Sequence, residues 1–201
     1  MSAHIYIEGA ASGDNSKAMK IVCQKAFNQL LLKMGFQGRM PRLTACGGRG
    51  NAFNRFTTAH SRANAGDFIA MLVDSEDPVE NVEETWRHLQ SRDQWKKPAG
   101  AVDEQALLMT RCMETWIVVD RNTLKQHYGD NLQENALPSL DNLENIEPHD
   151  LEKKLCHATR NCTNVYAKGR RSFDLLAKLN PAALQRLPSF ARIARILNQK
   201  M

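Results

Sequence analysis

The segment that decides the fold reads, from residue 67 to residue 77, DFIAMLVDSED. Its first part is an almost continuous apolar run, which is typical of a strand that is covered on both faces of a parallel sheet. Its last part is acidic and runs into Pro78, which ends the strand because proline has no backbone N–H to donate. The segment therefore predicts a central strand with acidic side chains at its carboxyl end.

Two shorter apolar segments precede this strand, and helical patterns separate them. Residues 4–7 and 41–46 are expected strands. Between them, apolar residues recur at three- and four-residue steps from Met19 to Met34, which is the spacing of an amphipathic helix. Strands that alternate with helices pair in parallel through right-handed crossovers. The pattern therefore predicts an α/β sandwich.

The polar residues before two of the helical stretches are the expected N-terminal caps. Asn15 or Ser16 is placed to cap the first helix, and Asn51 is placed to cap a second helix that extends to about residue 64. Asn and Ser side chains accept hydrogen bonds from the backbone N–H groups that the first helical turn leaves unpaired.

Beyond the acidic segment the pattern becomes mainly helical. We expect residues 1–125 to form the core and residues 126–201 a basic, mostly helical extension packed on it as one compact unit. The expected elements are, in order, a helix at 81–91, a strand at 107–110, a helical turn at 113–120, a loop-rich linker at 130–150 and helices at 150–160, 171–179 and 181–197.

The composition of the chain excludes several classes of protein. No segment approaches the run of about 20 apolar residues that crosses a bilayer, and the N-terminus has no signal-peptide pattern. Five scattered cysteines are typical of small packing groups in a reducing compartment. The phosphate-loop pattern G-x-x-x-x-G-K-S/T does not occur, which argues against a self-contained NTPase. We therefore expect a soluble cytoplasmic protein with no membrane contact.

Charge is distributed unevenly along the 201 residues, whose formal net charge is +5. Residues 1–73 carry +6, residues 74–150 carry −10 and residues 151–201 carry +9. Lys and Arg supply most of the non-specific affinity for nucleic acid, so the basic tail predicts contacts with phosphates. The alternatives are that the tail docks on the protein's own acidic middle or is a solvated face. The candidate contact residues are Arg170, Arg171, Arg192 and Arg195, with Arg49 in the glycine-rich turn after the second strand.

Three acidic residues follow expected strands: Glu8 comes after the first strand, and Asp74 and Glu76 come after the third. The carboxyl ends of parallel strands meet at one edge of a sheet, where open α/β sheets bind ligands. Carboxylates brought together repel unless a cation joins them, and oxygen ligands suit Mg²⁺ or Mn²⁺. Asp77 is a further carboxylate beside the pair. The alternative for each acid is a helix cap or a solvated turn.

The order of these motifs resembles the Toprim fold, the metal-binding domain of topoisomerases, primases and overcoming-lysogenization-defect nucleases. It is more closely similar to a small stand-alone Toprim-like family of unknown function, found beside ABC-type ATPases in bacterial defence loci. The fold class expected from the resemblance is a Rossmann-like, mainly parallel sheet flanked by helices, with a C-terminal helical extension. The matching motifs are Ile5–Gly9, Cys46–Arg49, Leu72–Asp77, Met113–Trp116 and Tyr166–Gly169.

The resemblance also implies roles for individual residues. Glu8 resembles the Toprim glutamate, and Asp74 resembles the first acid of its D-x-D motif. The second acid of that motif is replaced here by Glu76, with Asp77 next to it, so either is a candidate metal ligand. Glu114 would serve a second metal, and Lys168 would neutralise charge that develops on a phosphate.

The residues and the resemblance together predict a Mg²⁺- or Mn²⁺-dependent nuclease that acts on DNA or RNA. We expect it to be the effector of an antiphage defence system that works with a separate ABC-type ATPase. The alternatives are a non-catalytic Toprim-like adaptor that binds the ATPase or nucleic acid, and a phosphohydrolase for a small nucleotide.

Overall fold

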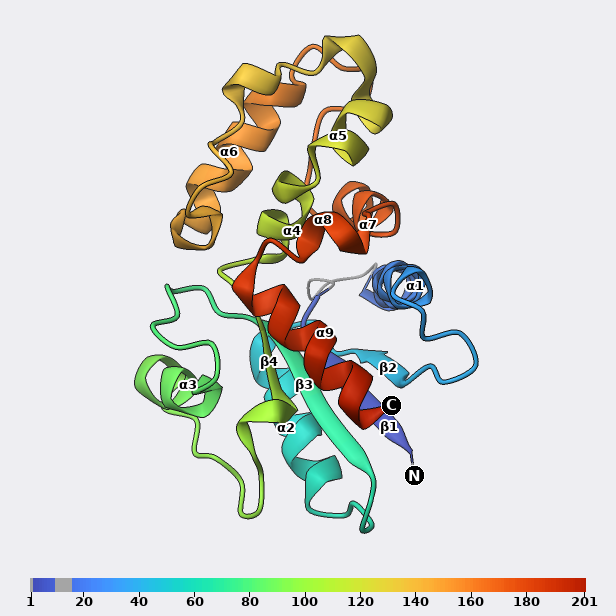
Figure 1. Cartoon of the computed structure of the whole chain (residues 1–201), viewed down its shortest axis with the longest axis vertical. Coiled ribbons are helices and arrows are strands. Elements are labelled where there is room, and N and C mark those ends of the chain that lie inside the picture. Colours follow the sequence, from blue (N-terminus) through green and yellow to red (C-terminus); the bar gives the residue numbers. More distant parts are fainter. Residues whose placement is uncertain (1, 10–15) are drawn as a thin grey trace.

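Four strands form one parallel sheet in the computed structural model, which describes residues 2–9 and 16–201 (Figure 1). The strand order is β2-β1-β3-β4, and each neighbouring pair is parallel. The α/β class with a parallel sheet flanked by helices is thus confirmed, and all four expected strands are present. Their bounds are β1, Ala3–Ile7; β2, Arg42–Ala45; β3, Phe68–Asp74; and β4, Ala106–Met109.

Helices cover both faces of this sheet, which explains the continuous apolar run of β3. One face packs against α1 (Ser16–Lys33) and α9 (Pro188–Lys200), and the other packs against α2 (Arg49–His60) and α3 (Thr85–Asp93). In Figure 1, α9 crosses in front of the sheet and α2 lies behind it. Successive residues of β3 point to opposite faces. The first face receives Phe68, Ala70 and Leu72, and the second receives Ile69, Met71 and Val73.

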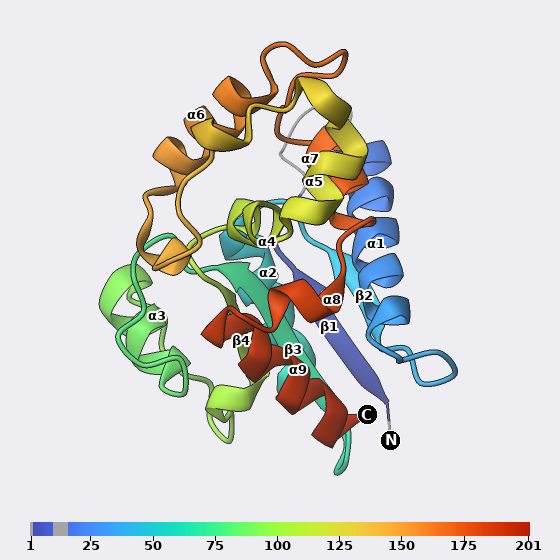
Figure 2. The ribbon, with the colours of Figure 1, turned by 45° about the horizontal axis from the view of Figure 1, so that its top comes forward.

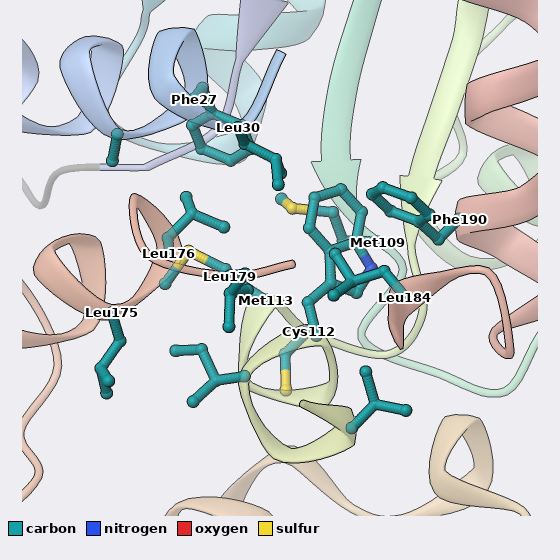
Figure 3. Close-up of a cluster of buried hydrophobic side chains, with 14 of the residues drawn as sticks. Phe27, Leu30, Met109, Cys112, Met113, Leu175, Leu176, Leu179, Leu184 and Phe190 are labelled. Carbon is teal, nitrogen blue, oxygen red and sulfur yellow. The ribbon is translucent and has the colours of Figure 1, made fainter. Parts of the chain in front are cut away.

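The remaining helices lie beyond the carboxyl ends of the strands (Figure 2). They pack on the sheet through one hydrophobic cluster, which contains Cys112 and Met113 at the start of α4, Phe27 and Leu30 of α1 and residues of the C-terminal helices (Figure 3). The expected boundary at residue 125 falls inside α5. These helices are α4, Met113–Val119; α5, Arg121–Tyr128; α6, Pro148–Thr159; α7, Arg170–Leu176; and α8, Pro181–Leu184.

The structure corrects two expected helices. The second helix begins at Arg49, with Gly48 as its N-cap, so Asn51 lies inside the helix and does not cap it. The single helix expected over residues 181–197 is two helices, because Pro188 starts α9 after a turn that follows α8. The expected cap at Asn15 lies outside the described residues.

Among the residues that the structure describes, no helix has the length and apolar character needed to cross a membrane.

Candidate metal centre

Glu8, Asp74 and Glu76 meet at the carboxyl edge of the sheet. β1 and β3 are direct neighbours, and the Glu8 N–H continues their ladder by donating to the Leu72 carbonyl at 2.8 Å. Glu8 Oε2 accepts a hydrogen bond from the Asp74 N–H at 3.0 Å. Each of the three acids offers one carboxylate oxygen, and these oxygens all lie within 4.8 Å of one another. The structure therefore brings together the three acids that the sequence singled out.

Gly9 allows the chain to pass close to α1 directly after Glu8. Its φ of 141° is one that side-chain-bearing residues rarely adopt, and a Cβ there would lie 3.0 Å from Cys23 Sγ. The Gly9 N–H donates to the Gly47 carbonyl at 2.9 Å, and the Gly47 N–H donates back at 3.1 Å. These bonds tie the end of β1 to the end of β2 and fix the position from which Glu8 projects.

Burial and the neighbouring acids disfavour the charged form of the Asp74 carboxylate. Burial raises the pKa of Asp74 well above its ordinary value, and the charges of Glu8, Glu114 and Glu76 raise it further, against the weaker influence of Lys168. Asp74 Oδ1 is buried and has no hydrogen-bond partner in the described part of the chain. An unpaired buried carboxylate oxygen is costly. A set of oxygen ligands with such an atom fits a hard divalent cation such as Mg²⁺ or Mn²⁺.

Glu8 has a partial counter-charge in Arg49. Burial raises the Glu8 pKa above its ordinary value, while Arg49 and the hydrogen bond from the Asp74 N–H oppose this rise. Arg49 Nη1 lies 3.7 Å from Glu8 Oε2 and also donates to the Asp74 carbonyl. Arg49 is the first residue of α2, so the early start of that helix places its guanidinium beside the acids.

Arg49 is held in this position by α3 and the loop that follows it. Its guanidinium donates to both carboxylate oxygens of Asp93, at 3.1 and 2.6 Å, and its Cζ lies 4.9 Å from the centre of the Trp95 ring. The side chain is only 13% exposed. The donors of Arg49 are thus used inside the protein, and its contact with nucleic acid stays a prediction. The sequence carried no signal for Asp93 or Trp95, which lie more than 40 residues downstream.

Glu76 and Asp77 have different surroundings. Glu76 belongs to the group of three carboxylates. Asp77 is 57% exposed and lies next to two arginines, with its Oδ2 at 3.0 Å from Arg92 Nε and its Oδ1 at 3.9 Å from Arg111 Nη2. Of the two acids that the sequence left as alternatives, Glu76 joins the cluster and Asp77 is engaged by arginines beside it.

Glu114 and Lys168 lie near the cluster but have partners of their own. Glu114 is buried in the first turn of α4, and its Oε1 accepts a 2.7 Å hydrogen bond from the Tyr166 hydroxyl. Lys168 Nζ lies 3.4 Å from Glu152 Oε2. Burial favours the neutral amine of Lys168, but the charges of Glu114 and Glu152 outweigh this and raise its pKa. Lys168 therefore stays charged within electrostatic range of Asp74.

The basic tail is partly neutralised by the protein's own acids. Arg192 is buried, and its Nε lies 3.1 Å from Glu83 Oε2, which also faces Arg195 Nη2 at 2.8 Å. Lys200 Nζ lies 2.5 Å from Glu104 Oε2. These contacts favour the alternative that the tail docks on the acidic middle of the chain, and the contact of Arg192 with nucleic acid stays a prediction.

Three of the candidate arginines are exposed: Arg195, which faces Glu83, and Arg170 and Arg171. Arg170 and Arg171 are the first residues of α7, and Arg171 Nη1 donates to the Val165 carbonyl at 2.6 Å. The loop before α7 carries Lys168, and Met19 of α1 lies 3.6 Å from a Cβ built on Gly169. These arginines therefore begin a helix next to α1, on the same side of the molecule as the end of β1.

The fold and this centre define an α/β protein with an oxygen-only acidic site at the carboxyl edge of a parallel sheet. A family model described as "Domain of unknown function (DUF4276)" matches residues 9–198, and the chain belongs to that family. None of the curated proteins and none of the solved structures compared with the chain matches it.

Proposed function

We propose that the protein is a metal-dependent nuclease that hydrolyses phosphodiester bonds in DNA or RNA. Glu8, Asp74 and Glu76 would hold Mg²⁺ or Mn²⁺. The observation that supports this proposal most directly is the approach of their carboxylate oxygens to within 4.8 Å, together with the unpaired, buried Asp74 Oδ1. Three carboxylates held this close repel one another without a cation, and the sheet edge where they meet is the usual ligand site of an open α/β fold.

The chemistry assigns separate tasks to the surrounding residues. A bound divalent ion would polarise a phosphoryl oxygen and lower the pKa of a water molecule. The Asp74 N–H orients the Glu8 carboxylate by its hydrogen bond to Oε2. Arg49, fixed by Asp93, limits the negative charge of the site on one side. Lys168 keeps its proton and would stabilise negative charge that builds up on the phosphate in the transition state.

The proposal includes a relation to the Toprim fold and a separate ATPase partner. The motifs around Glu8, Asp74, Glu114 and Lys168 support the first part, because their order matches that of the Toprim-like family. The lack of a phosphate-loop pattern in the sequence supports the second part, because nucleotide-driven timing would then have to come from another chain. We propose an ABC-type ATPase in this role and an antiphage defence system as the setting.

One observation favours the alternative of a non-catalytic adaptor. Arg49 already gives Glu8 a counter-charge at 3.7 Å, and a protein that has lost its metal would need such an internal cation. The adaptor would use the same fold to bind the ATPase or nucleic acid, and it would have no need of Asp74 as a carboxylate.

A cleavage assay on the complex tests the proposal. The chain is co-expressed with the ABC-type ATPase expected beside its gene, and the purified complex is offered labelled DNA, messenger RNA and transfer RNA with ATP and Mg²⁺ or Mn²⁺. We expect cleavage of one of these substrates that disappears with EDTA and in the Asp74→Asn variant. Metal-independent cleavage, or full cleavage by Asp74→Asn, would refute the metal-site assignment. A complex that assembles and cleaves nothing would support the adaptor.

A further inference from the structure

We propose that Arg111 is a positioning residue that holds Glu76 in place as a metal ligand and connects the centre to the helical extension. This inference rests on the proposed function, since it assigns Glu76 to a metal. Arg111 directly precedes Cys112 and α4, and it lies 35 residues beyond Glu76 in the chain. No motif in the sequence pointed to it.

The backbone of Glu76 adopts a conformation that requires support. Its φ is 63°, in the left-handed region that residues other than glycine adopt only at a cost in free energy. Arg111 satisfies both backbone groups of this residue. The Glu76 N–H donates to the Arg111 carbonyl at 2.8 Å, and Arg111 Nε donates to the Glu76 carbonyl at 2.8 Å. One residue therefore fixes the peptide groups on both sides of the Glu76 side chain.

The other donors of Arg111 reach the segment that leads into α6. Nη1 donates to the Asn145 carbonyl at 3.2 Å, and Nη2 donates to Glu147 Oε1 at 2.6 Å. Asn145 ends a short turn of 3₁₀-helix, and Glu147 is the residue before α6. The guanidinium is planar, permanently charged and buried, so it can hold three separate acceptors in a fixed arrangement. Lysine in its place would have the charge without this geometry.

The loop that carries Asp74 and Glu76 is fixed from both sides. The Ser75 N–H donates to the Met109 carbonyl at 2.9 Å, and the Ser75 hydroxyl donates to the Asp77 carbonyl at 2.7 Å. Beyond Glu76, the Asp77 carboxylate faces Arg92 and Arg111. These contacts use the backbone and Asp77, and they leave the carboxylates of Asp74 and Glu76 for the centre. A residue that orients a metal ligand in this way typically changes metal affinity 10- to 100-fold when it is altered.

A double-mutant cycle tests the inference with a readout other than activity. Binding of Mn²⁺ alone is measured by electron paramagnetic resonance of free Mn²⁺ for the wild type, Arg111→Lys, Glu76→Gln and the double variant. We expect Arg111→Lys to weaken Mn²⁺ binding about tenfold when Glu76 is present. In the Glu76→Gln background, the same substitution should change the affinity little. Arg87→Lys, an exposed arginine on α3 paired with Glu84, is the matched control and should bind Mn²⁺ as the wild type does.

Two outcomes would overturn the inference: an unchanged affinity in Arg111→Lys, or an equal loss in both backgrounds. If Arg111→Lys does not fold, Glu147→Gln replaces it in the cycle. Glu147 is 63% exposed, so its substitution removes the charge that holds Arg111 without opening the core. We then expect a smaller loss that also requires Glu76, and no loss would overturn the inference. Wild-type Mn²⁺ binding that is absent, or that persists in Asp74→Asn, would instead refute the metal site itself.

Discussion

Arg192 Nε and Glu83 Oε2 lie 3.1 Å apart, although 109 residues separate them in the chain. The contact joins α9 to the loop that follows β3. The same guanidinium donates to the Ala106 carbonyl at 3.3 Å and to the Asp103 carbonyl at 2.8 Å. Arg192 therefore serves as an internal connector between the basic tail and the acidic middle of the chain.

Replacing Arg192 should destabilise the protein. In Arg192→Met the buried Ala106 carbonyl loses this donor, whereas the Asp103 carbonyl keeps the hydrogen bond from the Thr85 hydroxyl. An unsatisfied buried acceptor typically costs about 1–3 kcal/mol. We expect the free energy of unfolding to fall by roughly 2–3 kcal/mol in urea denaturation. Arg195→Met is the control, because Arg195 is 45% exposed and pairs with the same Glu83. We expect this variant to lose less than about 1 kcal/mol of unfolding free energy. Equal stability of Arg192→Met and the wild type would contradict this role.

Nucleic-acid binding should depend on Arg170 and Arg171. These side chains are exposed at the start of α7, so changing both to Glu should weaken binding and reduce its dependence on salt. The measurement is the slope of log affinity against log salt concentration for labelled DNA and RNA. Arg87→Glu combined with Lys96→Glu, both exposed and outside α7, changes the charge by the same amount and should bind nearly as the wild type does. If both variants lose the same affinity, the binding surface is not at α7.

The metal-free protein should become less stable as the pH rises because of Asp74. Its pKa in the folded state is raised by burial and by neighbouring acids, whereas in the unfolded chain it has the ordinary value of about 3.9. Between these two values the folded protein binds more protons than the unfolded chain, so stability falls with increasing pH. The raised pKa of Glu8 acts in the same direction.

Asp74→Asn should remove this component. Urea denaturation in EDTA at a series of pH values is expected to show a flatter profile for the variant, and a higher stability than the wild type at the upper end of the series. The difference between the two proteins isolates Asp74 from acids with lowered pKa values, such as Asp93 and Glu83. Identical pH profiles of the two proteins would mean that burial and the neighbouring acids do not raise the pKa of Asp74.

The hydrogen bond from Tyr166 to Glu114 should contribute to stability. Burial and the charge of Glu114 raise the Tyr166 pKa, so the phenol keeps its proton and remains a donor. Tyr166→Phe leaves a buried carboxylate oxygen without its donor, and we expect a loss of about 1–3 kcal/mol in unfolding free energy. Tyr128→Phe is the matched control, because Tyr128 is also buried, and it should change stability by less than about 1 kcal/mol. A larger loss in the control would contradict the prediction.

The strands and the acidic edge could be predicted because both follow from local patterns. An apolar run flanked by turn residues identifies β3 in the sequence, and alternation with helices predicts parallel pairing. Glu8 directly follows β1, Asp74 is the last residue of β3 and Glu76 lies two residues beyond it, so the topology alone brings them to one edge. The helix starts were less predictable, because Gly48 begins α2 without any side-chain cap.

The residues around the acids could not be predicted, because each is recruited from a distant segment. Asp93 reaches Arg49 from the end of α3, and Arg111 reaches Glu76 across the loop before α4. Asp77 pairs with Arg92 and Arg111 and so stays outside the group of three carboxylates, and no local sequence pattern connects it to these arginines. Pairing of Arg192 with Glu83 likewise depends on how α9 folds back over the sheet. Sequence patterns show which charges exist, and tertiary packing decides which of them are neutralised.

The most direct test of the metal centre is a Mn²⁺ titration of the wild type, Asp74→Asn and Asp77→Asn, with the amount bound measured by equilibrium dialysis. Both substitutions remove one negative charge, and their positions are only three residues apart, but only Asp74 belongs to the group of three carboxylates. We predict that the wild type and Asp77→Asn bind Mn²⁺ with similar affinity and that Asp74→Asn loses this binding while remaining folded. Undiminished binding in Asp74→Asn would contradict the account.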